Sequence, residues 1–110
     1  MKIEYDRYEL FLLFENEKIL NIDAEIMEYS FSDQDFTFVL YFSPYEEFAS
    51  ISLKYAQWDE SIYTIDMNNI TKIGLKDFAK DWKKLCFYRN NSIEPVLSLS
   101  QPSIYLEYEI

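Results

Sequence analysis

The fold is decided by the stretch FTFVLYF, residues 36–42, in which large apolar side chains recur at every second position. A period of two places these side chains on one face of a β-strand, whereas a helix would space them by three and four residues. We therefore expect a strand that turns this face to the core of a sheet protein. The inward residues are Phe36, Phe38, Leu40 and Phe42.

Alternation of the same kind continues on both sides of this stretch. Residues 51–55 and 62–67 predict a hairpin across the turn-like segment 57–61. Residues 1–14 and 18–31 also alternate, but the phase slips once in each, and a β-bulge would account for the slip. The strands predicted in this way span residues 1–14, 18–31, 36–42, 51–55, 62–67, 96–100 and 104–110.

One segment has a different period. Its apolar residues are spaced by three and four, and lysines and aspartates fill the positions between them, which predicts an amphipathic helix at about residues 75–87. Its apolar stripe consists of Leu75, Phe78, Ala79, Trp82, Leu85 and Cys86. Because strands are segregated from this lone helix, we predict an α+β fold. The fold would be a mainly antiparallel β-sheet or β-sandwich of about seven strands, with the helix between strands five and six.

Size and composition predict a single domain, residues 1–110, in the cytoplasm. A chain of 110 residues is near the commonest domain size, and 49 % apolar residues are enough for one core. The longest apolar run, Leu10 to Phe14, is far shorter than the roughly 20 residues that cross a bilayer. The first residues mix charges of both signs, unlike a secretory leader. A single cysteine agrees with a reducing compartment.

The charge of the chain is strongly negative and uneven. The net charge is -10, with 15 acidic and 4 basic residues in positions 1–70 but 2 acidic and 6 basic residues in positions 71–92. Such a charge repels nucleic acid and anionic membranes and speeds the encounter with a basic protein. We therefore expect a basic protein partner, with no direct contact to nucleic acid or membrane, although acidity can also serve solubility alone.

The residues that most enzymes use are missing from the sequence. There is no histidine, which removes the commonest general base and the commonest metal ligand. One glycine, Gly74, is not enough for either phosphate-binding glycine motif. Cys86 is the only cysteine, so a zinc site built from paired cysteines is excluded. We expect no catalytic residues, no metal and no cofactor. A pair of carboxylates in a glycosidase-like arrangement remains an alternative, because the sequence does not give their separation.

Two acidic clusters with aromatic residues are candidate partner-binding surfaces. In an up-and-down series of strands, alternate connections lie at the same end of the sheet. We expect one end to carry Asp33, Asp35, Trp58, Asp59 and Glu60, with Trp58 as a possible anchor. The second choice is the opposite end, which would carry Glu15, Glu17, Tyr45, Glu46 and Glu47.

A small acidic β-rich domain without catalytic residues resembles the immunity proteins of contact-dependent growth inhibition and other bacterial polymorphic toxin systems. The resemblance implies a non-catalytic protein that neutralises a cognate toxin domain, often a nuclease, by covering its active site or an adjacent surface. Two other classes stay open. One is an acidic mimic of nucleic acid, although the carboxylates of this chain are not regularly spaced. The other is a small structural or assembly domain of phage or secretion-system origin.

Overall fold

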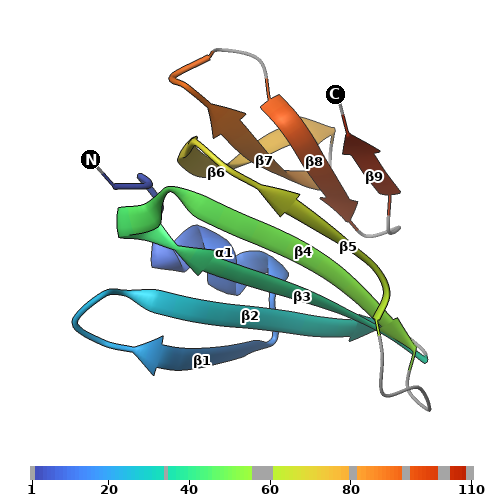
Figure 1. Ribbon diagram of the computed structural model, residues 1–110. Helices are drawn as coiled ribbons and strands as arrows, with labels where there is room; N and C mark the ends of the chain where they lie inside the picture. Colours follow the sequence, from blue (N-terminus) through green and yellow to red (C-terminus); the bar gives the residue numbers. More distant parts are fainter. Residues whose placement is uncertain are drawn as a thin grey trace.

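The computed structural model describes residues 2–33, 35–55, 61–79, 82–92, 95–101 and 105–108, and within them the chain forms two antiparallel sheets and one α-helix (Figure 1). The elements in chain order are α1 (Arg7–Leu13), β1 (Asn16–Asn21), β2 (Ile26–Asp33), β3 (Phe36–Ser43), the 3-10 turn η1 (Pro44–Glu46), β4 (Phe48–Tyr55), β5 (Ser61–Met67), β6 (Ile70–Ala79), β7 (Trp82–Arg89), β8 (Pro95–Gln101) and β9 (Tyr105–Tyr108).

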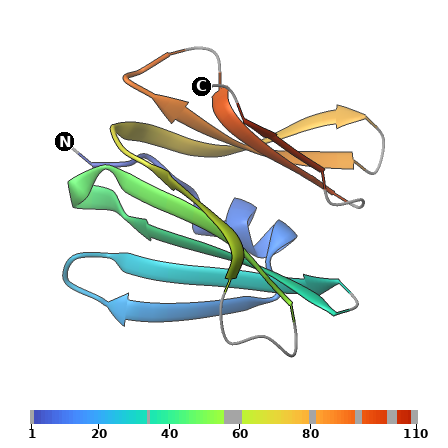
Figure 2. The same ribbon diagram turned by 45° about the vertical axis from the view of Figure 1, so that its right-hand side comes forward.

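Within each sheet, strands that are neighbours in the sequence pair with each other. The first sheet has the order β1-β2-β3-β4-β5 and the second the order β6-β7-β8-β9. The chain passes from one to the other at Asn68 and Asn69, where Asn69 adopts a left-handed conformation (φ 60°). The amide of Ile70 then donates to the carbonyl of Glu47, 2.8 Å away. The sheets form two layers, and α1 lies between them (Figure 2).

The core lies between these two layers. Phe38, Leu40 and Phe42 of β3 are fully buried, as their alternation predicts, and they form one cluster with Leu85 and Phe87 of the second sheet. Phe36 is the exception, with 39 % of its surface exposed, because it begins the strand beside a turn. The rings of Phe42 and Tyr29 stack with centroids 6.0 Å apart.

The predicted class, a mainly antiparallel β fold with one helix, is confirmed, but the predicted position of the helix is wrong. Of the predicted helix, residues 75–79 belong to β6 and residues 82–87 to β7, and these strands pair with each other. Leu75 lies opposite Leu85 and Ile73 opposite Phe87, so apolar pairs also recur at a period of two. Cross-strand packing of these pairs outweighs the helical spacing of the same residues. Nine strands are present in the described residues, where about seven were predicted.

The single α-helix of the described residues lies where the sequence predicts a bulged strand. The carboxylate of Asp6 caps its first turn by accepting a hydrogen bond from the amide of Tyr8, at 2.8 Å. Leu10 and Leu13, three residues apart, point into the core. The helix has only seven residues, and no helix in the described part of the chain is long and apolar enough to span a membrane.

A hairpin also replaces the second predicted bulged strand. Residues 18–31 belong to β1 and β2, which pair across the turn 22–25. The side-chain oxygen of Asn21 accepts a hydrogen bond from the amide of Ala24 at 2.9 Å, and Glu25 adopts a left-handed conformation (φ 55°). An asparagine that bonds to the backbone of a turn is a common turn signal.

The N-terminal segment, residues 2–5 before the helix cap, connects the two sheets. The amide of Ile3 donates to the carbonyl of Pro44 at 3.0 Å, next to the first sheet. The amide of Glu4 donates to the carbonyl of Thr71 at 2.9 Å, and the carbonyl of Glu4 accepts from the amide of Ile73 at 2.9 Å, both in the second sheet. The Ile3 side chain is fully buried between these contacts.

We predict that Phe42→Ala lowers the free energy of unfolding by about 3–5 kcal/mol, the usual cost of deleting a buried aromatic ring. Phe42 is fully buried and contacts Tyr5 of the N-terminal segment, with ring centroids 4.9 Å apart. Val39→Thr, a change of similar volume on the opposite face of β3, is the control and should cost less than about 1 kcal/mol. Urea denaturation measures both. Equal losses for the two variants would show that the faces of β3 are assigned wrongly.

Candidate functional site

The first predicted acidic surface lies only partly within the described residues. Asp35 is exposed in the connection between β2 and β3. Phe36 of β3 lies opposite Tyr55, so this connection and the one between β4 and β5 are at the same end of the sheet. The side chain of Asp33 and the residues Trp58, Asp59 and Glu60 lie outside the described part. That they form one binding surface stays a prediction.

The structure does not bring the second predicted surface together. Met27 lies opposite Phe42, so η1 and its residues follow β3 at the end of the sheet that also carries the β1–β2 turn. Asn16, at the start of β1, lies opposite Ser30, far along β2. Glu15 and Glu17 are therefore separated from the other three residues, Tyr45, Glu46 and Glu47.

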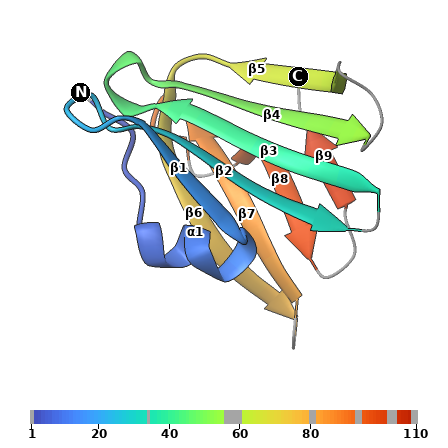
Figure 3. The same cartoon turned by 90° about the horizontal axis from the view of Figure 1, so that it is seen from below.

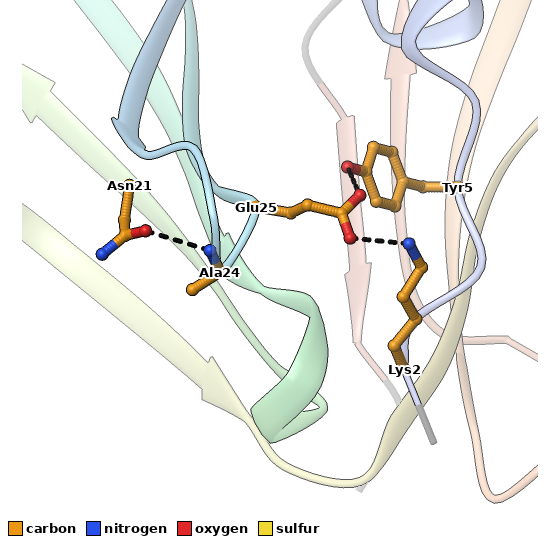
Figure 4. A network of polar contacts seen from close by, with 5 residues as sticks. All are labelled: Lys2, Tyr5, Asn21, Ala24 and Glu25. Atoms are coloured by element: carbon orange, nitrogen blue, oxygen red, sulfur yellow. Dashed lines mark hydrogen bonds and ion pairs between the residues drawn. The ribbon is translucent and has the colours of Figure 1, made fainter.

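Glu25 is the centre of the first of two polar networks (Figure 4). Its Oε2 accepts from the Lys2 ammonium at 2.6 Å, and its Oε1 accepts from the Tyr5 hydroxyl at 2.9 Å. The Lys2 hydrogen bond lowers the pKa of Glu25. Burial, followed by donation to Glu25, raises the pKa of Tyr5 to about 12. The left-handed backbone of Glu25 turns its carboxylate from the β1–β2 turn toward the N-terminal segment.

Glu17 of β1 is the centre of the second network. Arg7 of α1 donates to both of its carboxylate oxygens, from Nη2 at 2.6 Å and from Nε at 3.1 Å. The hydroxyl of the buried Tyr29 donates to the same carboxylate. Hydrogen bonding by Arg7 lowers the pKa of Glu17, while burial and the bond to Glu17 raise the pKa of Tyr29.

The two networks fasten the N-terminal segment and α1 to the β1–β2 hairpin. In each, one carboxylate of the hairpin binds one cation and one tyrosine hydroxyl. The lowered pKa values of Glu17 and Glu25 and the raised pKa values of Tyr5 and Tyr29 move the titration of all four groups further from neutral pH. A group held in one protonation state near pH 7 is poorly suited to exchange protons there. What the networks do in the structure is hold α1 and the N-terminal segment against the β1–β2 hairpin.

The candidate surface is the outer side of α1 and the adjacent edge strand. Tyr8, Phe11 and Leu12 lie on one side of the helix, and they are 84 %, 48 % and 60 % exposed. A shallow apolar hollow is lined by Arg7, Tyr8 and Phe11. Figure 3 shows α1 beside β1 on this side of the molecule. We define the α1–β1 surface by its exposed large apolar residues: Tyr8, Phe11, Leu12, Ile19, Leu20 and Ile22.

Carboxylates surround the helical part of this surface. Glu4, Asp6 and Glu9 line a hollow together with Lys72 of β6. Glu15 is exposed at the C-terminal side of the helix, just before β1. Among the carboxylates whose side chains the structure describes, only Glu17 and Glu25 form ion pairs. The arrangement therefore combines exposed aromatic and aliphatic side chains with acidic groups that a partner can neutralise.

Sequence reasoning missed the α1–β1 surface because it assigned residues 1–14 to a strand. In a strand, Tyr8, Leu10 and Leu12 would share one inward face. In the helix, Leu10 turns inward while Tyr8 and Leu12 turn outward. The missed signal is a helix start, with Asp6 as the cap and Glu9 three residues later.

No group of three or more histidine, cysteine, aspartate or glutamate side chains that could hold a metal occurs among the described residues. The side chain of Cys86 is buried in β7. Comparison of the chain with protein-family models, with curated proteins and with solved structures finds no match. Any functional assignment therefore depends on the residues of this chain.

We predict that the carboxylate of Glu17 stabilises the fold at neutral pH and that this contribution is lost at acidic pH. A carboxylate with a lowered pKa in the folded state stabilises it above the unfolded pKa, near 4.5, and this stabilisation is lost as the pH falls through the folded pKa. The free energy of unfolding of the parent should exceed that of Glu17→Gln at pH 7, and the difference should shrink below pH 4.5.

Urea denaturation from pH 7 to pH 3 checks this dependence. Glu15→Gln is the matched control, because Glu15 is exposed and has no ion pair with another described residue. The control should follow the parent at every pH. A constant difference between the parent and Glu17→Gln over the whole range would mean that ionisation of Glu17 does not contribute.

Proposed function

We propose that this chain is a non-catalytic binding protein, an immunity protein that neutralises a basic bacterial toxin domain by covering its active site or an adjacent surface. The single observation that carries the proposal is the excess, among the described residues, of carboxylates without a cationic partner. A nuclease is the preferred class of toxin, because its active site attracts phosphate and is therefore basic. The proposed compartment is the cytoplasm, where such a toxin acts.

The distribution of ion pairs supports an acidic binding role. Two carboxylates of the described part are neutralised by Lys2 and Arg7. The other carboxylates whose side chains the structure describes form no ion pair with another such residue: Glu4, Asp6, Glu9, Glu15, Asp23, Glu28, Asp35, Glu46, Glu47 and Asp66. A surface of this kind steers a basic protein toward it and accelerates association at low salt.

The chemistry of the side chains favours binding over catalysis. The chain has no histidine, and its one cysteine is buried. The carboxylates with lowered pKa values, Glu17 and Glu25, are held in tight networks with cations and tyrosine hydroxyls. Exposed aromatic residues beside carboxylates that a partner can neutralise are typical of protein interfaces.

We predict that the chain protects cells from a toxin domain encoded immediately upstream of its gene. Co-expression should restore growth, and the purified proteins should form a complex. Their association rate should fall as salt rises to about 0.5 M, because the Debye length shrinks well below its value of about 8 Å at physiological ionic strength. Stopped-flow association kinetics across a salt series measures this effect.

The matched control is a parent complex measured at constant ionic strength with a neutral osmolyte in place of salt. Its association rate should remain that of the low-salt parent, apart from the effect of viscosity. If the complex forms at the same rate at all salt concentrations, recognition by charge is wrong. If the toxin is bound but remains active, the chain is a binding protein of another kind.

A further inference from the structure

We infer that the α1–β1 surface is the recognition surface, and that its occupant is a basic face of a folded protein with an apolar socket for the α1 side chains. This inference rests on the proposed function, because it assigns the place where the basic partner is captured. It differs from both surfaces predicted from the sequence, since neither includes Tyr8, Phe11 or Leu12.

Exposed apolar area is concentrated on this surface. Among the residues whose side chains the structure describes, nine large apolar side chains are exposed, and six of them lie between Tyr8 and Ile22. Single exposed apolar residues are ordinary, but a group on adjacent elements marks a site of association. Ile19 and Leu20 point to opposite sides of β1. Because β1 is the edge strand of its sheet, one partner can contact both.

The negative charge is concentrated on the same part of the chain, which selects the chemistry of the occupant. Residues 4–28 contain eight acidic and two basic residues, a balance of -6 out of the total of -10. Of the two basic residues, Arg7 is already paired with Glu17. The like charge opposes a second copy of the chain on this surface and favours a partner rich in lysine and arginine.

The surface is held in place before any partner arrives. Leu10 and Leu13 are buried under α1, and Arg7 joins the helix to β1 through two hydrogen bonds to Glu17. The ring of Phe11 packs edge-on against Tyr29, with centroids 6.0 Å apart. Side chains fixed in this way lose little freedom on binding, which favours affinity.

The arrangement matches the usual anatomy of a binding hot spot. Aromatic anchors at the centre of an interface carry much of the binding energy, and a rim of polar groups excludes water from them. Here Tyr8 and Phe11 flank the apolar hollow. Glu9 of α1 and Glu15, which directly precedes β1, supply negative charge at the rim. Loss of the anchors should raise the dissociation rate, and loss of the rim charges should slow association.

A random peptide library displayed on phage tests the surface directly, because it offers every combination of basic and apolar side chains to the chain at once. The bait is the full chain, either the parent or the variant Tyr8→Gln, Leu12→Gln. The matched control is Phe36→Gln, Ile62→Gln, which removes two exposed apolar side chains at the end of the sheet predicted from the sequence. Circular dichroism and urea midpoints first show that each bait is folded.

The parent and the control should enrich peptides that combine lysine or arginine with apolar residues. Synthetic versions of these peptides should bind the Tyr8→Gln, Leu12→Gln variant about tenfold or more weakly. Should that variant fail to fold, Glu9→Gln, Glu15→Gln replaces it, with Asp35→Asn, Glu46→Gln as its control. The Glu9→Gln, Glu15→Gln variant should associate with the peptides about threefold or more slowly than the parent at low salt. The Asp35→Asn, Glu46→Gln control should associate at the rate of the parent.

Other results of the selection would overturn either the proposed function or only the location of the recognition surface. If the parent enriches no peptides, or only peptides without lysine or arginine, the proposed function and the inference are both overturned. If basic peptides instead bind the Tyr8→Gln, Leu12→Gln variant as tightly as the parent and bind the Phe36→Gln, Ile62→Gln control more weakly, the inference alone is overturned. This result assigns recognition to the end of the sheet that carries Phe36 and Ile62. Sedimentation that shows dimers of the parent and monomers of the α1 variant would assign the surface to a second copy of the chain.

Discussion

The structure depends on the insertion of the N-terminal segment between the two sheets. Ile3 is fully buried there, and backbone hydrogen bonds from Ile3 and Glu4 reach both layers. Each buried amide needs a partner, so these bonds fix the segment at one depth. Lys2, Tyr5 and Arg7 then meet two carboxylates of the β1–β2 hairpin. The position of α1, and with it the exposure of Tyr8 and Leu12, follows from this one placement.

The sequence predicts the fold well where a single period is present and poorly where two periods coincide. Residues 36–42 alternate strictly, and their buried side chains are those that the alternation indicates. Residues 75–87 fit a helix by spacing, but Ile73, Leu75, Leu85 and Phe87 also fit two paired strands. The choice depends on contacts between residues distant from any local window, which a periodic pattern does not contain.

The candidate site was predictable in its charge and not in its location. Composition indicates an acidic binding protein, but the surface that carries the anchors depends on which side of residues 7–13 packs inward. The helical start at Asp6 is visible in the sequence, and it competes with an alternation that extends through the same residues. Strand register decides the rest: it separates Glu15 and Glu17 from Tyr45, although all were expected at one end of the sheet.

The contact between the N-terminal segment and β6 also sets an order of events during synthesis on the ribosome. Strands β2 to β5 each pair with the strand made just before, so the first sheet can assemble as the chain emerges. Glu4 must wait for Lys72, its bridge partner, which is translated about 68 residues later. The amide of Ile3 can therefore bond to Pro44 before β6 is made, but the layer of the second sheet that covers the Ile3 side chain arrives only later. A nascent chain that stops before β6 can still join Lys2, Tyr5 and Arg7 to the β1–β2 hairpin. It leaves Glu4 without its backbone partners Thr71 and Ile73, so the closure of the two sheets waits for β6.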